Sequence, residues 1–215
     1  MKFNTKQIAM IGMLCAIAFV AVALIRIPVV SFLKYEPKDV IVAMGGFMFG
    51  PLASFAISAV VSLVEMVTIS DTGVIGCLMN LISTCAFACT AAIVYKKRRT
   101  LSGAVIGLVS GVAVMTALML LWNWLITPLY MGYPREAVAA MLAPVFLPFN
   151  LLKGGLNAGI TLLIYKPVVQ ALRRARLLES SDNAAPARRN TGMTLVALLV
   201  IVTCVLFVLA LRGVI

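Results

Sequence analysis

Apolar residues fall in seven runs along the chain, separated by short polar segments, and this alternation predicts a bundle of membrane-spanning helices. A helix needs about 20 mainly apolar residues to cross a bilayer. The runs predict helices over residues 7–25, 39–49, 52–69, 74–95, 101–126, 147–171 and 193–211. The run at 39–49 is short for an upright crossing at about 1.5 Å per residue, so its glycines indicate close packing against neighbouring helices.

The composition places the chain among integral membrane proteins of the all-α class. Hydrophobic residues make up 63% of the 215 residues and charged residues 12%, whereas soluble domains are about half apolar and a quarter charged. The net charge of +11 does not indicate nucleic-acid binding, because Lys and Arg cluster in short loops between apolar runs. The first run lacks a small-residue cleavage site, so we expect a retained helix rather than a signal peptide.

The basic loops predict how the chain sits in the plasma membrane. Short loops rich in Lys and Arg stay on the cytoplasmic side. With the N-terminus inside, the basic cluster at 96–99 and the arginines at 173–189 also fall inside. The seventh helix then places the C-terminus outside, and four acidic residues fall at or near the outer face: Glu36, Asp39, Asp71 and Glu136.

Polar side chains from four predicted helices lie at a similar depth, in the outer half of the membrane: Glu65, Asn80, Asn123 and Lys153. Lys153 shares a helical face with Asn150 and Asn157, because spacings of three and four residues return to one side of a helix. A charge facing lipid costs at least about 2.5–3.5 kcal/mol, so Lys153 is expected to face protein or a wet cavity. The layer predicts a pocket open to the outside and lined by amide and ammonium donors.

Structural interpretations of the same residues remain open. Asn80 or Asn123 could form a hydrogen bond between helices, and Lys153 could extend to the membrane surface. Glu65 could be the buried partner of Lys153 or an interface residue. Aromatic residues near the outer face are typical of the interfacial belt, although a planar ligand would meet them: Trp122, Trp124, Tyr130 and Tyr133.

Small residues recur on the first predicted helix, at Ala9, Gly12 and Ala16. Small side chains allow helices to approach closely in lipid. These three residues are expected either to pack inside the chain or to form a docking face for a membrane partner.

The sequence has no evident catalytic, metal or nucleotide site. The five cysteines lie in apolar runs without a CxxC pair, and there is no histidine. A GxxxxGK[ST] phosphate loop is absent. A membrane enzyme using Glu65 or Lys153 would lack a second catalytic group at a defined spacing. Without internal repeats or an ionisable group at the midplane, an autonomous transporter is also disfavoured. A one-sided pocket with no energy source indicates a binding subunit that needs a partner.

Four segments, in order, resemble the substrate-binding S component of energy-coupling-factor (ECF) vitamin transporters, most closely the riboflavin-specific members: "SFLKYEPKDVIVAMGGFMFGP", "GVIGCLMN", "NWLITPLY" and "LPFNLLKGGLNA". The resemblance covers about residues 5–175. It implies a six-transmembrane-helix fold that binds its vitamin with high affinity on the outer side. Such a component associates with a transmembrane coupling subunit and two cytoplasmic ATPases, and is thought to topple in the membrane to release the vitamin inside.

The resemblance also implies roles for individual residues. Ala9, Gly12 and Ala16 would form the docking face, and the first loop would be part of a lid. Riboflavin would be the transported ligand, with no resident cofactor and no catalysis. Asn157, one turn deeper than Lys153, is expected to support the site. An S component for another vitamin is the alternative, because pocket residues decide the ligand. The implied ligand-binding residues are Lys34, Tyr35, Met79, Asn80, Asn123, Asn150 and Lys153.

The chain departs from the family after residue 175. We expect a six-helix substrate-binding domain at 1–175, a polar cytoplasmic linker at 176–191, and an additional transmembrane helix within 192–215. The lack of polar residues in this last helix favours a lipid-exposed or partner-facing position.

Overall fold

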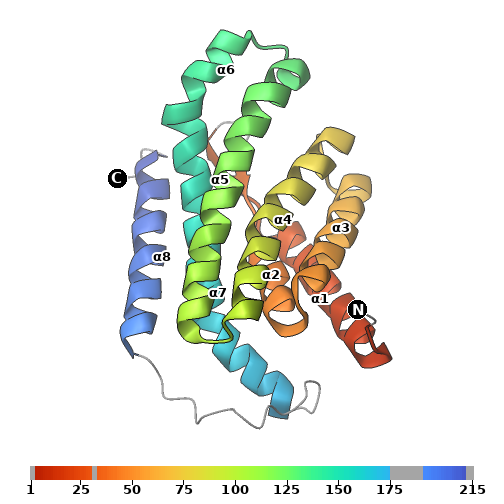
Figure 1. The fold of residues 1–215 in the computed structure, drawn as a ribbon. Coiled ribbons are helices and arrows are strands. Elements are labelled where there is room, and N and C mark those ends of the chain that lie inside the picture. Colours follow the sequence, from red (N-terminus) through yellow and green to blue (C-terminus); the bar gives the residue numbers. More distant parts are fainter. Residues whose placement is uncertain (1–2, 31–32, 175–190, 212–215) are drawn as a thin grey trace.

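The computed structural model describes residues 3–30, 33–174 and 191–211, and it is almost entirely helical (Figure 1). The part of the expected linker at 176–190 lies outside the described residues. The helices are α1 (Thr5–Leu24), α2 (Lys38–Phe49), α3 (Pro51–Thr68), α4 (Gly73–Lys97), α5 (Leu101–Met131), α6 (Arg135–Met141), α7 (Leu147–Arg174) and α8 (Thr191–Leu211), and a π-helical turn, η1 (Leu142–Phe146), joins α6 to α7.

Local sequence signals explain where several helices begin and end. Asn4 caps α1 by accepting a hydrogen bond from the backbone N–H of Gln7, whose side chain accepts in return from the Asn4 backbone. Thr100 caps α5 in a similar way through the N–H of Gly103. Between α2 and α3 the chain turns at Gly50, with φ at 96°, where only glycine is free of steric cost. Pro51 then begins α3.

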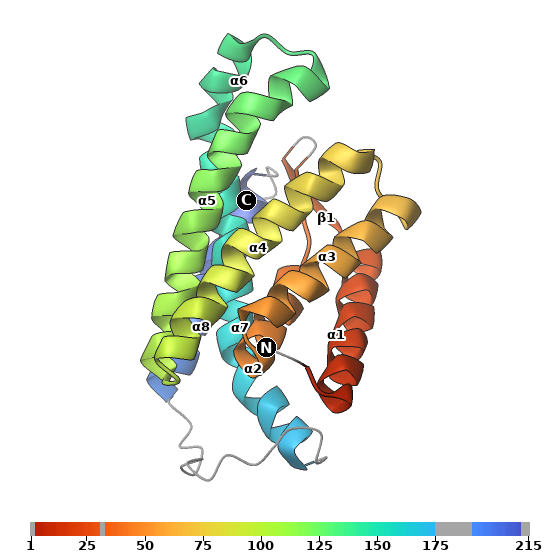
Figure 2. The ribbon, with the colours of Figure 1, turned by 45° about the vertical axis from the view of Figure 1, so that its right-hand side comes forward.

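The segment after α1 forms a β-hairpin, where the sequence predicts a loop. Strand β1 (Ile27–Val30) pairs antiparallel with β2 (Leu33–Tyr35), with Ile27 opposite Tyr35 and Pro28 opposite Lys34. Figure 2 shows the hairpin in the upper half of the bundle, beside the end of α4 that follows the α3–α4 turn. The strands are too short to give an alternating pattern that sequence can distinguish from a loop.

The chain between α5 and α7 is also more regular than predicted. α5 continues through Pro128 to Met131 and ends at Gly132, which has the left-handed φ of 67°. The expected end at residue 126 is therefore five residues early. Residues 135–146 are helical as well, so α6, η1 and α7 form one continuous helical stretch.

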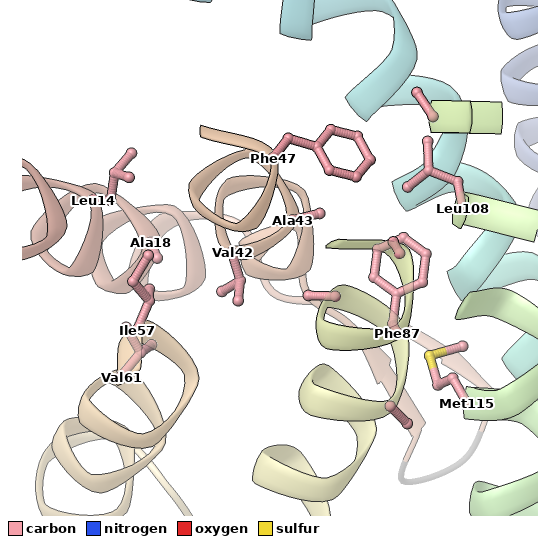
Figure 3. Close-up of a cluster of buried hydrophobic side chains, with 14 of the residues drawn as sticks. Leu14, Ala18, Val42, Ala43, Phe47, Ile57, Val61, Phe87, Leu108 and Met115 are labelled. Carbon is pink, nitrogen blue, oxygen red and sulfur yellow. The ribbon is translucent and has the colours of Figure 1, made fainter. Parts of the chain in front are cut away.

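The main core lies between α1, α2, α3, α4 and α5 (Figure 3). α4 packs closely along α5, because Gly107 and Gly111 face the backbone of α4. A Cβ at Gly111 would lie 2.5 Å from the Phe87 carbonyl oxygen, and one at Gly107 would lie 2.7 Å from that of Ala91. Small residues bring membrane helices together in this way. Labelled residues in the core include Leu14, Val42, Phe47, Ile57, Val61, Phe87, Leu108 and Met115.

Within the described residues, five helical stretches are long and apolar enough to cross a membrane: Thr5–Leu24, Pro51–Thr68, Gly73–Lys97, Leu101–Met131 and Arg135–Leu172. A shorter apolar stretch, Thr194–Leu209, lies in α8. α2 has only 12 residues and is mostly buried among its neighbours, as its glycines predict.

Candidate ligand-binding site

A cavity of about 210 Å³ lies between the hairpin, the α3–α4 turn, α4, α5 and α7. It reaches the surface at exposed residues such as Asp71 and Tyr130. Its inner part is formed by the buried side chains of Asn123, Asn150 and Lys153. The cavity is therefore entered from the end of the bundle that carries the hairpin.

The cavity combines apolar walls with polar groups. Concave sites with apolar walls and a few convergent polar groups are typical of small-molecule binding. Apolar and aromatic walls come mainly from α4, α5 and α7: Ile75, Met79, Met119, Trp122, Ile126, Tyr130 and Phe149. Polar groups come from six segments: Arg26, Lys34, Glu36, Ser70, Asp71, Thr72, Asn80, Ser83, Asn123, Thr127, Asn150 and Lys153.

Lys153 is buried against an acid that is distant in sequence. Its ammonium nitrogen lies 3.4 Å from Asp39 Oδ2, and the two side chains are 7% and 0% exposed. Thr84 Oγ1 donates a hydrogen bond of 2.6 Å to Asp39 Oδ1, and Asn157 Nδ2 donates one of 3.1 Å to Oδ2. Asp39 thus joins α2, α4 and α7. The pairing rules out extension of Lys153 to the membrane surface.

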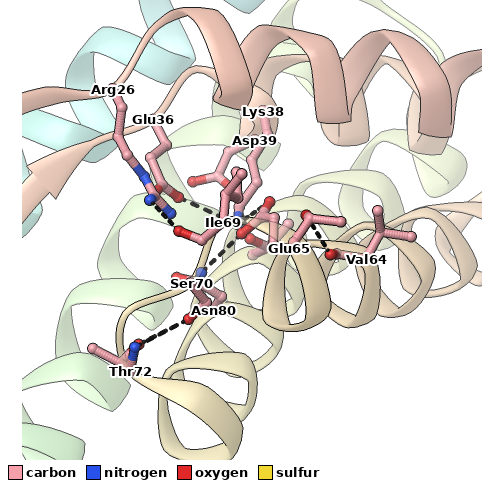
Figure 4. A network of polar contacts seen from close by, with 12 residues as sticks. Arg26, Glu36, Lys38, Asp39, Val64, Glu65, Ile69, Ser70, Thr72 and Asn80 are labelled. Atoms are coloured by element: carbon pink, nitrogen blue, oxygen red, sulfur yellow. Dashed lines mark hydrogen bonds and ion pairs between the residues drawn. The ribbon is translucent and has the colours of Figure 1, made fainter.

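A second set of charges connects the cavity to α2, α3 and the segment that follows α1 (Figure 4). Lys38 Nζ lies 2.6 Å from Glu65 Oε2 and 3.3 Å from Glu36 Oε2. Arg26 Nε contacts Glu36 Oε1 at 2.9 Å. Asn80 Nδ2 donates a hydrogen bond of 3.0 Å to Glu65 Oε2. Lys38 is therefore the partner of Glu65, and of the two alternatives left open for Glu65 the structure has an interface residue rather than the partner of Lys153.

The charges of this network balance. Arg26, Lys38 and Lys153 contribute three cations, and Glu36, Asp39 and Glu65 contribute three carboxylates. At the mouth, Lys34 pairs with Asp71 at 3.2 Å. Burying an unpaired charge is costly, whereas a paired and hydrogen-bonded charge is tolerated. Each cation lining the cavity therefore has a carboxylate beside it, and the site has no spare positive charge.

Glu36 lies between the hairpin and α2, outside the spanning helices. Burial alone would raise the pKa of its carboxyl, but the cations of Lys38, Lys153 and Arg26 outweigh burial and hold the pKa below its ordinary value. Because this pKa is lower in the folded chain, the carboxylate stabilises the fold above its ordinary pKa. That contribution is lost as the pH falls through the lowered value.

The cavity brings together six of the seven side chains predicted to bind ligand, with Tyr35 outside it. Tyr35 is buried, and its hydroxyl donates a hydrogen bond of 2.9 Å to Asn157 Oδ1. The side chains in the lining are Lys34, Met79, Asn80, Asn123, Asn150 and Lys153. Tyr35 and Asn157 thus lie behind the cavity wall and fix the position of the hairpin relative to α7.

Comparison with known proteins identifies the family. The family model described as "ECF transporter, substrate-specific component" matches residues 6–165, which is most of the chain. The chain belongs to this family. Its members are components of transporters and not enzymes, so this multi-pass membrane component works with other parts of an ECF transporter.

Individual relatives agree with this assignment. The chain is 30% identical to "Riboflavin transporter FmnP" of Bacillus subtilis (strain 168) over 81% of this chain and 99% of the relative. It is 29% identical to "Riboflavin transporter RibU" of Staphylococcus aureus (strain TCH60), over 80% of this chain and 94% of that protein. The solved structure titled "Structure and mechanism of the S component of a bacterial ECF transporter" is similar with a TM-score of 0.67 and 28% identity, covering 79% of this chain and 98% of that one.

The small residues of α1 lie on the outside of this ECF substrate-specific component. Ala9, Gly12 and Ala16 are exposed, and a Cβ at Gly12 would meet nothing within 4 Å. The opposite side of α1 packs inward through Leu14 and Ala18. Internal packing therefore does not explain the small residues, and the stripe remains open on the surface of the S component.

Several residues of the site were not predicted from the sequence. Arg26 and Glu36 line the cavity from the segments flanking the hairpin, which has no recognisable strand pattern. Met119 and Thr127 lie one turn on either side of Asn123, so a search at spacings of four would have found them. Trp122 lines the cavity, whereas Trp124 is 43% exposed and outside the lining.

Proposed function

We propose that this ECF substrate-specific component binds riboflavin in the cavity from the outer side and delivers it to an ATP-driven transporter complex. The observation that carries the proposal is the cavity itself, which is open at the hairpin end and closed at Asn123, Asn150 and Lys153. Relatives that match over most of their length are riboflavin transporters by name, which favours this vitamin.

The chemistry of the cavity suits riboflavin. Its dimethylbenzene edge needs apolar walls such as Met79, Trp122 and Phe149. Its ring polar atoms and ribityl hydroxyls need donors and acceptors such as Asn80, Asn150 and Lys153. Riboflavin is neutral, and the cavity's cations already have carboxylate partners. A neutral ligand can therefore enter without leaving a charge uncompensated.

Delivery requires partners that supply energy. We infer a transmembrane coupling subunit and two cytoplasmic ATPases, with the exposed stripe of Ala9, Gly12 and Ala16 as the docking face. A stripe without bulky side chains suits close contact with another membrane helix. The cytoplasmic side is the end that carries the basic α4–α5 turn, because Lys and Arg in short loops remain inside. The cavity then opens outside.

The direct test is a titration of the detergent-purified protein with riboflavin, following flavin and tryptophan fluorescence. We expect saturable binding with a submicromolar Kd and quenching that depends on Trp122, which lines the cavity. The same titration with other vitamins tests the alternative ligand. Saturation by another vitamin but not by riboflavin would assign this S component a different substrate.

Lys153→Gln tests the site. Loss of a hydrogen bond from a charged group costs about 1.5–3 kcal/mol, so the Kd for riboflavin should rise about tenfold or more. Lys166→Gln is the matched control, because Lys166 is exposed on the same helix and outside the cavity lining. Equal affinity of both variants and the wild type would place the vitamin elsewhere.

A further inference from the structure

The last helix, α8, packs into a groove on α7 formed by two glycines one turn apart. A Cβ at Gly155 would lie 3.2 Å from Cys204 Sγ, and one at Gly159 would lie 2.9 Å from Ile201 Cγ1 and 3.3 Å from the Ala197 carbonyl oxygen. Ala197 is 1% exposed. Glycines at a spacing of four allow two helices to approach closely in a membrane. α8 is therefore fitted to α7 along one face, and is not wholly surrounded by lipid.

The same face of α8 reaches the hairpin. α8 contacts β1, and Ile201, Cys204 and Val208 pack against a second buried apolar cluster. The buried cluster joins the hairpin to α6, η1 and α7: Val29, Leu33, Tyr35, Val138, Phe146, Phe149, Leu152 and Leu156. α8 thus packs against the second buried cluster, which in turn holds the hairpin.

This cluster lies directly behind the cavity. Leu33 and Phe149 belong to the cluster and also line the cavity. Tyr35, next to Lys34 of the lining, donates its hydroxyl to Asn157, which in turn bonds to Asp39, the partner of Lys153. A displacement of the hairpin would therefore move cavity walls and the polar contacts behind them together.

We propose that α8 positions the hairpin over the ligand cavity, with Ala197, Ile201, Cys204 and Val208 as positioning residues that slow ligand release. α8 lies beyond residue 165, where the family match ends, so this role is an addition to the family fold. This role of α8 rests on the proposed function only for the identity of the ligand, because the effect of α8 on the hairpin can be measured without a ligand.

Two substitutions at neighbouring positions of α8 test its packing on α7, because one disturbs the contact and the other leaves it intact. Ala197→Phe places a bulky ring against Gly159 and forces α8 away from α7. Val196→Phe is the matched control, because Val196 is 56% exposed. Riboflavin dissociation, followed by stopped-flow fluorescence, should be about tenfold faster in Ala197→Phe, since changes at one binding site act mostly on the dissociation rate. The control should release riboflavin at the wild-type rate.

Backbone hydrogen exchange of the hairpin supplies the ligand-free measurement. Without riboflavin, the amides of β1 and β2 should exchange faster in Ala197→Phe than in Val196→Phe. If the wild type fails to bind riboflavin but the hairpin still responds, the ligand assignment is wrong and the role of α8 stands. Unchanged exchange and unchanged release in Ala197→Phe would overturn the role of α8.

A cross-link tests the packing itself. Gly155→Cys places a second sulfur beside Cys204, close enough for a disulfide with the usual S–S separation of about 2.05 Å. Oxidation should lock α8 on α7 and keep riboflavin release as slow as in the wild type or slower. The double variant Gly155→Cys/Cys204→Ser controls for the other cysteines. Failure of the pair to cross-link would show that α8 does not occupy the groove, and would overturn the proposal.

Discussion

Lys38 shows how one buried cation holds two helices and the segment between the hairpin and α2 together. It is 1% exposed and lies between Glu36, before α2, and Glu65 of α3. Taking these charges out of water is unfavourable, and the close geometry with additional hydrogen bonds offsets that cost. Removing either Lys38 or Glu65 alone is therefore more destabilising than removing both, because it leaves the other charge buried without a partner.

Lys38→Met is expected to lower the free energy of unfolding by about 3–5 kcal/mol, because it leaves buried carboxylates without their cation. Adding Glu65→Gln should recover part of this loss. A double-mutant cycle of detergent-solubilised protein, measured by thermal unfolding, gives the coupling. Lys97→Met, an exposed lysine at the other end of the bundle, should unfold like the wild type. Additive effects of the Lys38 and Glu65 changes would contradict the coupling.

At the scale of residues, the sequence predicted which polar side chains come together better than it predicted their partners. The depths of Asn80, Asn123, Asn150 and Lys153 follow from counting along helices, and the structure brings these four side chains to one cavity. Their partners depend on how each helix rotates about its axis, which sequence spacing does not determine. Asn123 illustrates this: its amide donates to the Met119 carbonyl of its own helix and not to a neighbouring helix.

At the scale of elements, the long apolar helices were predictable and the connections were not. Twenty apolar residues leave few alternatives to a spanning helix. The hairpin has only four and three residues in its strands, so tertiary packing decides its form. α5 passes through Pro128, where proline would ordinarily indicate an end. The helix nevertheless continues to Met131 and ends at Gly132, which has the left-handed φ of 67°.

The exposed stripe of α1 leads to a prediction about docking. Gly12→Leu should leave riboflavin affinity unchanged, because Gly12 faces open space and is not among the residues that line the cavity. Vitamin uptake by cells that hold the complete transporter should fall severely, since the bulky side chain prevents close approach of a partner helix. Uptake of labelled riboflavin is the measurement.

Met13→Leu is the control for this experiment, because it conserves volume at an adjacent exposed position on α1. It should retain both binding and uptake. Normal uptake by Gly12→Leu would exclude the stripe as the docking face, while loss of binding would mean that α1 also shapes the site.

At the scale of the whole molecule, charge is divided between the two ends of the bundle. In Figure 1 α1 begins at the lower right of the bundle, and α8 ends on the left, below the level of α6. The basic turn from Lys96 to Arg99 joins α4 to α5 at the lower end, whereas the α3–α4 turn, which holds Asp71, and the start of α6, which holds Glu136, are toward the upper end. Figures 1 and 2 place α8 beside α7, away from α1, so the extra helix leaves the exposed stripe of α1 uncovered.

The proposed orientation can be tested with cysteines introduced at the two ends. Asp71→Cys should react with a membrane-impermeant thiol reagent in intact cells, because it is exposed at the mouth of the cavity. Arg99→Cys, in the basic turn, should react only after the membrane is permeabilised. The wild type, with five native cysteines, sets the background. The reverse labelling pattern would place the cavity on the cytoplasmic side.

The burial of Asp39 has a consequence for biogenesis. Asp39 and its hydrogen-bond donor Asn157 are 118 positions apart, and Lys153 is a neighbour of that donor on α7. During synthesis, α2 leaves the ribosome long before α7 does. An unpaired carboxylate in hydrocarbon is costly, so we expect α2 to be stably placed only after α4 supplies Thr84 and α7 supplies Lys153 and Asn157. We therefore expect the cavity to be completed at a late step of insertion, by the same contact that fixes Lys153.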